Sequence, residues 1–133
     1  MAFHLLREDE GRPKKPMIVC HGLLGSCVNW RSLCKQDKIQ RSRDCYLVGM
    51  RNHSESDHHE NHSYELMSED IIRFADQHDI PSFTLLGHSM GARAAMTTYC
   101  RFPDRVDGCI SVDAAPKNEM GNEVFGSFTY GVL

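Results

Sequence analysis

A serine flanked by glycines is the strongest chemical signal in the sequence. The segment Leu86-Gly87-His88-Ser89-Met90-Gly91 contains the pattern G-x-S-x-G, between an apolar run and a helical pattern. A strand, a sharp turn and a helix in this order form a nucleophile elbow, which lifts the serine to the edge of a sheet. We therefore predict that Ser89 is a nucleophile. Gly87 and Gly91 are expected to be required because a Cβ there would meet neighbouring backbone. A chance match in a loop is disfavoured by the flanking elements.

A second glycine-containing segment could stabilise the charge that such a nucleophile creates. His21-Gly22-Leu23-Leu24-Gly25 directly follows another apolar run. Acyl transfer needs two hydrogen-bond donors for the oxyanion, one from the residue after the nucleophile and one from a loop of this kind. We predict that the backbone N–H groups of Leu23 and Met90 are these donors, with Gly22 and Gly25 allowing close approach. The phosphate-binding patterns G-x-G-x-x-G and G-K-[ST] are absent from this loop.

The residues that would activate the serine are harder to find. A serine hydroxyl needs a histidine to take its proton and an acid to orient that histidine. In proteins that present the serine on a nucleophile elbow, the chain order is serine, acid, histidine. All eight histidines lie at or before His88. His21 is expected to be structural, and His88 is expected to point away from Ser89. Asp113, at the end of an apolar run, is the candidate acid.

Two clusters of potential metal ligands are interpreted as structural. The polar stretch 53–62 is rich in histidine and acidic residues but lacks the helical H-x-x-x-H spacing on an apolar-periodic helix, so we expect a solvated loop and no metal. The six cysteines form no C-x-x-C pair, and no secretory signal peptide precedes them. Reduced, mostly buried thiols in an intracellular compartment are the expected state.

The elements that must position Ser89 follow from four apolar runs, which are continuous rather than alternating. Such runs indicate strands covered on both faces of a parallel sheet. We place these strands at about 17–21, 46–50, 83–87 and 108–113, with an additional edge strand at 2–7. Helical patterns lie between them: one helix from an N-cap at Ser26 through Cys34, a second over 64–78, and a third from Met90 that Pro103 ends. The fold class is therefore α/β.

The composition limits the number of domains and the kinds of partner that the protein could have. The chain has 133 residues, is 41% hydrophobic and 25% charged, and suits a single globular domain. Its net charge of −3 disfavours a nucleic-acid partner, and its short apolar runs exclude a transmembrane segment. Acidic residues near the N-terminus do not suit a mitochondrial presequence.

These motifs together resemble the α/β-hydrolase fold family. Within it, the chain is similar to lipid and ester hydrolases of the abhydrolase domain-containing protein 11 group and related bacterial esterases. The resemblance rests on HGLLGS with Trp30, Arg51-Asn52-His53, His62-Ser63-Tyr64-Glu65, LGHSMGARAAM and 112–116. It implies cofactor-free hydrolysis of carboxylic esters such as acylglycerols, often in mitochondria. It also places the 17–21 strand between those at 46–50 and 83–87. Gly49 and Ser54 depart from the family pattern, which has an acidic residue and a glycine there.

The resemblance covers about residues 15–117, preceded by a segment, 1–14, and followed by an unmatched tail, 118–133. We therefore expect a truncated α/β-hydrolase fold that lacks the lid and the last strands. The exposed edge at 109–112 would then favour self-association. Two functions remain open: a serine ester hydrolase that is inactive as this chain, and a non-catalytic variant that binds a partner or has no function. Either way, the expected small-molecule partner is a lipid or other ester, and the expected compartment is mitochondrial or cytoplasmic.

Overall fold

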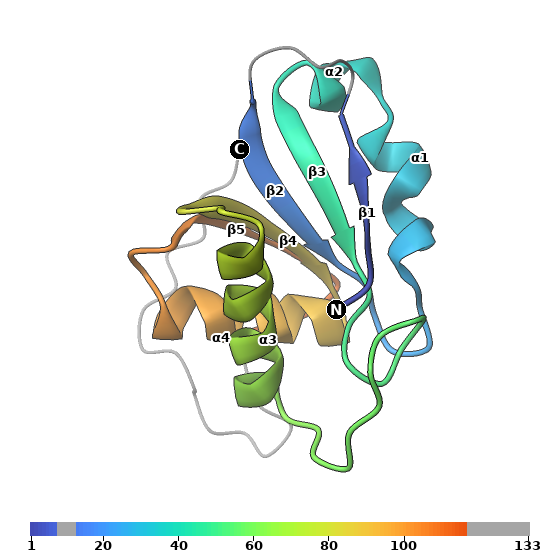
Figure 1. Ribbon diagram of the computed structural model, residues 1–133, viewed down its shortest axis with the longest axis vertical. Coiled ribbons are helices and arrows are strands. Elements are labelled where there is room, and N and C mark those ends of the chain that lie inside the picture. Colours follow the sequence, from blue (N-terminus) through green and yellow to red (C-terminus); the bar gives the residue numbers. More distant parts are fainter. Residues whose placement is uncertain (8–12, 117–133) are drawn as a thin grey trace.

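The computed structural model describes residues 1–7 and 13–116, which form one five-stranded sheet with helices on both faces (Figure 1). The strands lie in the order β1-β3-β2-β4-β5. Neighbouring strands are parallel, except that β1 runs antiparallel to β3. Their bounds are Phe3–Leu6 (β1), Lys15–Cys20 (β2), Arg43–Val48 (β3), Phe83–His88 (β4) and Val106–Val112 (β5). The predicted α/β class, the spatial strand order and the N-terminal edge strand are confirmed. The tail expected at 118–133 lies outside the described residues.

Side chains of the central strands pack alternately into two apolar clusters, one on each face of the sheet. In β2, Ile18 and Cys20 contribute to the larger cluster, and Met17 and Val19 contribute to the smaller one. All four side chains are almost fully buried. Because neither face of β2 is in contact with water, its sequence is a continuous apolar run rather than an alternating one.

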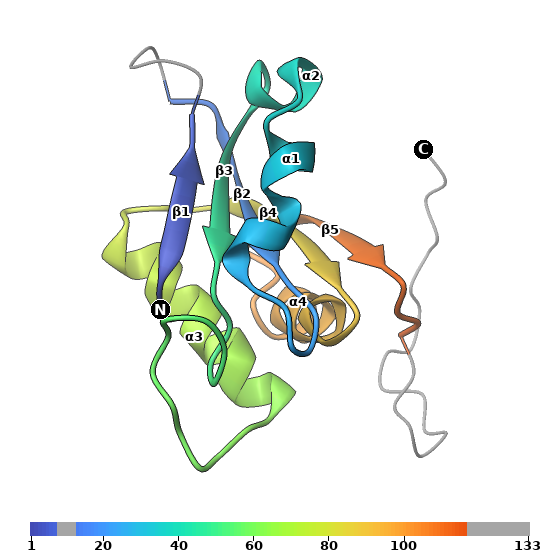
Figure 2. The same ribbon diagram turned by 90° about the vertical axis from the view of Figure 1, so that its right-hand side faces the viewer.

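Two long helices, α3 (Tyr64–Gln77) and α4 (Met90–Arg101), cover the face with the larger cluster (Figures 1 and 2). At the start of α3, the Ser63 hydroxyl caps the helix by accepting a hydrogen bond of 3.2 Å from the Leu66 N–H. Helix α4 begins directly at the turn after β4 and ends two residues before Pro103. Both helices agree with the sequence prediction to within two residues.

The other face is covered by the segment predicted as a helix from Ser26 through Cys34 and by one further helical turn after it. The segment that covers this face consists of a 3-10 helix, η1 (Cys27–Trp30), followed by two one-turn helices, α1 (Arg31–Cys34) and α2 (Asp37–Gln40). Residues 27–34 are helical as predicted, with a 3-10 first turn, and the extended backbone at Gln36, with φ −65° and ψ 134°, separates them from α2. Cys27 and Cys34 both reach the smaller cluster, so the apolar spacing also indicated the buried face correctly.

The predicted strand at 46–50 was placed too late. Strand β3 begins at Arg43, paired with Lys15 of β2, and includes the buried Asp44, a charged residue that interrupts the apolar pattern. Its carboxylate accepts hydrogen bonds from the Arg7 guanidinium at 2.9 Å and from the Lys14 N–H at 3.1 Å. The strand ends at Val48, and the Met50 N–H bonds to the His21 ring instead of to a neighbouring strand.

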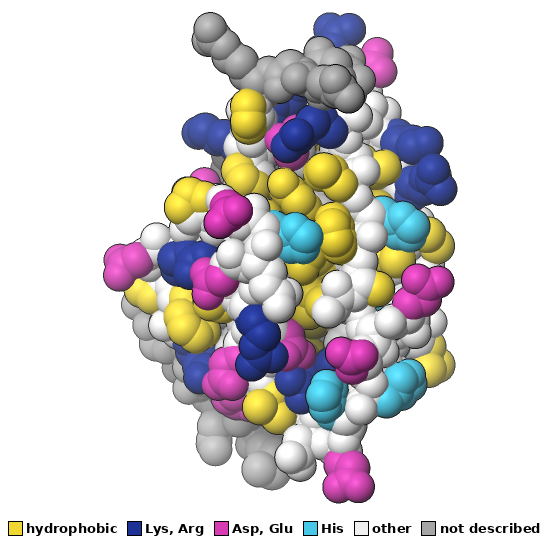
Figure 3. All heavy atoms as spheres, viewed as in Figure 1, with side chains coloured by type: hydrophobic (Ala, Val, Ile, Leu, Met, Phe, Trp, Pro, Cys, Tyr) yellow, Lys and Arg dark blue, Asp and Glu magenta, His cyan; other side chains and the backbone are white. Residues whose placement is uncertain are grey.

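Strand β5 forms one edge of the sheet as far as the structure describes it (Figure 2). It pairs with β4 on one side, and its exposed residues include Ile110, with 44% of its surface accessible. An apolar edge strand is a template for pairing with another strand. Self-association through this edge remains a prediction. On the face seen in Figure 3, acidic and basic side chains are interspersed.

Candidate active site

Ser89 occupies the turn between β4 and α4 in a backbone conformation that is unusual for a residue with a side chain. Its φ is 50° and its ψ is −113°. The turn is held on both sides: the Ser89 N–H donates to the Val112 carbonyl at 3.0 Å, and the Arg93 N–H donates to the Ser89 carbonyl at 3.1 Å. Strained backbone of this kind is concentrated at functional sites, where surrounding structure enforces it.

The glycines on either side of Ser89 make this turn possible. A Cβ on Gly87 would collide with the backbone carbonyl of Gly91, and a Cβ on Gly91 would lie only 2.5 Å from the His21 carbonyl oxygen. Real Cβ atoms do not approach backbone so closely, so both positions need glycine in this geometry. Helix α4 therefore crosses the end of β2 with backbone almost touching backbone.

The loop after β2 is brought to the same edge of the sheet as Ser89. Strands β2 and β4 are parallel neighbours in which Cys20 pairs with Gly87, so Leu23 and Met90 both follow the carboxyl ends of adjacent strands. The loop is tight: the Gly25 N–H donates to the Gly22 carbonyl at 3.0 Å. A Cβ on Gly22 would lie 2.7 Å from Nδ1 of His88, and one on Gly25 would lie 2.9 Å from the Gly22 oxygen.

His21 is buried and both of its ring nitrogens are hydrogen-bonded. Nε2 accepts from the Met50 N–H at 3.1 Å, so the proton of the neutral ring is on Nδ1, which donates to the Gly22 carbonyl at 2.8 Å. Burial lowers the pKa of His21, and the nearby His53 lowers it further, against an opposing effect of the Gly22 carbonyl. His21 thus joins the loop after β2 to the segment after β3, in agreement with the structural role expected of it.

Asp113 lies at the end of β5, one strand away from Ser89, but it is largely in solvent. Its side chain is 86% exposed, and its Oδ2 lies 3.8 Å from Nε2 of His88. Its φ of 56° is left-handed. The Ser89 hydroxyl makes no hydrogen bond to any residue in 1–7 or 13–116. The described residues therefore bring together the predicted nucleophile, Ser89, and the two predicted oxyanion donors, without a described base in contact with the serine.

A groove lies beside the glycine loop, between it and the short helix α1. It measures about 660 Å³ and is lined by Gly22–Gly25, Asn29, Trp30, Ser32, Leu33 and His88. The ring of Trp30 is 6.1 Å from that of His88. Sequence periodicity placed Trp30 on the inner face of a helix and missed its place at this groove. Its position as the only tryptophan, five residues after the glycine loop, was the available signal.

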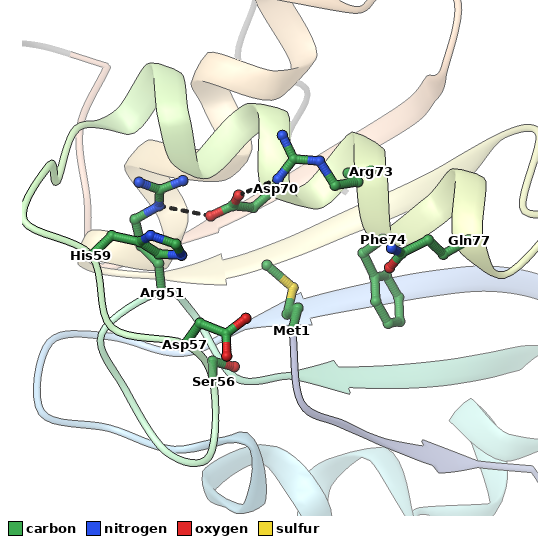
Figure 4. A pocket seen from close by; sticks show the side chains of 9 residues that line it. All are labelled: Met1, Arg51, Ser56, Asp57, His59, Asp70, Arg73, Phe74 and Gln77. Atoms are coloured by element: carbon green, nitrogen blue, oxygen red, sulfur yellow. Dashed lines mark hydrogen bonds and ion pairs between the residues drawn. The ribbon is translucent and has the colours of Figure 1, made fainter.

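A second, smaller cavity of about 150 Å³ lies away from the elbow, between α3 and the loop after β3 (Figure 4). Arg51 and Asp70 line it and form an ion pair of 2.7 Å, and Arg51 also donates to the Asn61 carbonyl at 2.8 Å. This arginine therefore serves to anchor the loop to α3. Across the described part of the chain, no three histidine, cysteine, aspartate or glutamate side chains are grouped as metal ligands.

Comparison with known proteins agrees with this geometry. The sequence profile of the alpha/beta hydrolase fold matches residues 15–128, and the chain belongs to this family. It is 36% identical over 128 residues to a probable alcohol acetyltransferase of Saccharomyces cerevisiae, covering 94% of this chain and 37% of the relative. It is 34% identical to the sn-1-specific diacylglycerol lipase ABHD11 of Mus musculus, covering 96% of this chain and 41% of the lipase.

The chain is also similar to a solved structure of an esterase. A marine microorganism esterase matches with a TM-score of 0.79 and 35% identity, over 87% of this chain and 42% of the esterase. The chain thus spans about two fifths of the length of these relatives. The predicted family is confirmed, and the site residues remain predictions.

Proposed function

We propose that this chain carries the nucleophile of a serine ester hydrolase. The observation that carries the proposal is the backbone of Ser89, which is held at φ 50° directly before α4 by two glycines that cannot bear a Cβ. This conformation presents the hydroxyl at the N-terminus of a helix, where negative charge is stabilised. The match to the alpha/beta hydrolase fold and the named esterase and lipase relatives support an ester substrate.

In the proposed reaction, Oγ of Ser89 attacks the carbonyl carbon of the ester, and the hydroxyl proton passes to a histidine. The N–H groups of Leu23 and Met90 donate to the oxyanion that forms. Collapse of this intermediate releases the alcohol, which takes the proton, and leaves an acyl group on Ser89. Water then hydrolyses this acyl-enzyme by the same steps. The groups used are all side-chain or backbone groups, and no cofactor enters the scheme.

The proposed reaction needs a histidine that follows Ser89 in the chain, and none of the eight histidines in the 133 residues lies after Ser89. Asp113 is our proposed acid because it follows the strand beside β4. Loss of the histidine in a serine protease lowers kcat by about 10⁶. We therefore propose that the 133-residue chain alone turns over no ester, and that activity needs a C-terminal part such as the longer relatives contain.

A second candidate function is acyl transfer to an alcohol. It uses the same acyl-enzyme, with an alcohol in place of water, and is favoured by the alcohol acetyltransferase relative of Saccharomyces cerevisiae. A non-catalytic role as a binding module is the third alternative. For the compartment we propose an intracellular location, mitochondrial or cytoplasmic, where the six free thiols would stay reduced. No helix of the described residues is long and apolar enough to cross a membrane.

The decisive experiment joins residues 1–116 to the C-terminal part of the marine esterase, whose sequence is 35% identical to this chain. The chimera should hydrolyse a p-nitrophenyl ester and react with a fluorophosphonate probe, and Ser89→Ala should abolish both. The unfused chain should do neither. Addition of ethanol separates the two chemistries, because a transferase would form the ethyl ester instead of the free acid. A folded chimera that labels equally well with Ser89→Ala would refute the assignment of the nucleophile.

A further inference from the structure

Two thiols that the proposed chemistry at Ser89 does not use lie against each other in the smaller apolar cluster. Cys34 belongs to the one-turn helix α1, and Cys45 belongs to β3, a strand of the sheet that α1 covers. Both side chains are fully buried in this cluster, and a hydrogen bond joins their sulfur atoms. All six cysteines lie within the described residues, and this is the one hydrogen-bonded pair among them.

Two other pairings of buried thiols are too long to be bridged. Cys27 and Cys34 are seven residues apart on a helical segment, which separates them by about 10 Å along its axis. Cys20 and Cys109 lie on strands with β4 between them, so about 10 Å of sheet separates them as well. Cysteines whose Cα atoms are more than about 7 Å apart form no disulfide unless the backbone moves. The contact between α1 and β3 therefore singles out one pair.

The hydrogen bond gives the two thiols different reactivity. The Cys45 S–H donates to the Cys34 sulfur, and this bond lowers the pKa of Cys34 against the opposing effect of burial. The same bond raises the pKa of Cys45, and burial and the negative charge of Asp44 raise it further. The thiolate is the reactive form of cysteine. Cys34 is therefore the thiol that attacks first, and Cys45 keeps its proton for a second step.

We propose that Cys34 and Cys45 form an oxidisable pair that hydrogen peroxide converts to a disulfide. The Cys34 thiolate attacks one peroxide oxygen, the O–O bond breaks, and the hydroxide that leaves takes up a proton to become water. The sulfur of Cys45 then attacks the sulfur of the Cys34 sulfenic acid, the S–O bond breaks, and the hydroxyl leaves as water with the Cys45 proton. In total the two thiols lose two electrons and two protons, and one peroxide is reduced to two waters.

The segment that covers the pair gives peroxide a route to it. Helices of one turn have little stability of their own, so α1 should open more readily than the strands beneath it. The reaction should therefore be slower than that of an exposed thiol. Once formed, the bond ties α1 to β3, and with it the groove wall that Ser32 and Leu33 of α1 contribute. The inference goes beyond the proposed function and does not depend on it.

Peptide mapping of the 133-residue chain tests the proposal. Trypsin cleaves after lysine and arginine, which places Cys34 in peptide 32–35 and Cys45 in peptide 44–51. The reduced, folded chain is treated with hydrogen peroxide, catalase stops the reaction, and N-ethylmaleimide in urea blocks the remaining thiols before digestion. Mass spectrometry should find the two peptides joined, lighter by two hydrogens than their sum, and a reductant should separate them.

Three variants test the roles of the thiols. In Cys45→Ser the sulfenic acid on Cys34 has no resolving thiol, so dimedone should trap it and no joined peptides should form. In Cys34→Ser the protonated Cys45 should give much less dimedone adduct. Cys27→Ser is the matched control, because it removes a buried thiol of the same cluster and should leave the joined peptides unchanged. Circular dichroism of each variant confirms that it is folded.

The unfolded chain shows whether the pairing depends on the fold. In concentrated urea the shorter loop between Cys27 and Cys34 closes at least as easily as the loop between Cys34 and Cys45, so the preference for the joined peptides should disappear. A folded chain that bonds Cys34 to Cys27 as often as to Cys45 would overturn the proposal. Oxidation of the folded chain only to sulfinic and sulfonic acids, without joined peptides, would overturn it as well. Equal dimedone adducts in Cys45→Ser and Cys34→Ser would refute the roles assigned to the two thiols.

Discussion

Replacing Gly91 with alanine tests the claim that α4 and β2 meet backbone to backbone beneath Ser89. The new Cβ would lie 2.5 Å from the His21 carbonyl oxygen, 2.7 Å from the Cys20 carbonyl carbon and closer still to the Cys20 oxygen. None of these atoms belongs to a flexible side chain, so β2 or α4 would have to move. Overpacking a well-packed interior costs about 1–3 kcal/mol, and contacts this short belong at the upper end.

Two effects of the substitution oppose each other. Alanine is favoured over glycine in a helix by about 1 kcal/mol, which offsets part of a clash of about 3 kcal/mol. The expected net loss of unfolding free energy is therefore about 2 kcal/mol. Gly108→Ala is the matched control, since its Cβ would make ordinary contacts with the Thr84 side chain, 3.5 Å from the methyl and 3.9 Å from the hydroxyl oxygen. That variant should gain about 0.5–1 kcal/mol because alanine restricts the unfolded chain.

Urea unfolding followed by circular dichroism measures both variants. A difference of about 3 kcal/mol between them, with an m-value of about 2 kcal/mol/M, separates their midpoints by about 1.5 M. The order of stability should be Gly108→Ala, the parent chain, then Gly91→Ala. If Gly91→Ala is as stable as the parent, the close crossing of α4 over β2 is wrong, and with it the reason for a strained Ser89.

Four further predictions follow from the same geometry. Ser89→Gly should raise the unfolding free energy by about 1 kcal/mol, because it relieves a positive φ, whereas Ser89→Ala should not; urea unfolding of both variants decides this. The pKa of buried His21 is lowered from its usual 6.5, so the unfolded chain takes up this proton first. Its contribution to stability should be present above about pH 6.5 and lost as the pH falls below it, and His21→Gln should flatten the measured slope between pH 6.5 and 5. Ile110→Lys should reduce self-association in sedimentation, since a charge on an edge strand opposes pairing; a parent chain that is already monomeric would contradict the predicted association. Of the six thiols, the exposed Cys100 should react first with a thiol reagent, and rapid labelling of a buried cysteine in the folded chain would count against the described core.

Local patterns in the sequence were enough to predict the α/β class, the parallel strands and the position of Ser89. Continuous apolar runs such as Phe83–Leu86 are produced by burial on both faces, and the glycines around Ser89 answer a steric demand within one turn. Such signals are short in sequence, so they can be interpreted without knowing what lies across the sheet. The sequence prediction was wrong where the signal depended on a contact with a residue distant in the chain. The start of β3 was placed too late because Asp44, which is buried and paired with Arg7, interrupts the apolar pattern.

Only the tertiary structure decided what surrounds Ser89. Hydrogen bonds from the His21 ring to Gly22 and from the Met50 N–H to the ring join segments 29 residues apart, and no periodicity encodes them. The same holds for the groove, where Trp30 faces His88 across elements that are distant in sequence. The sharp turn at Ser89 could be predicted because such a turn constrains its own neighbours in the chain. The positions of its partners depend on the strand order, which brings the ends of β2, β4 and β5 to one edge.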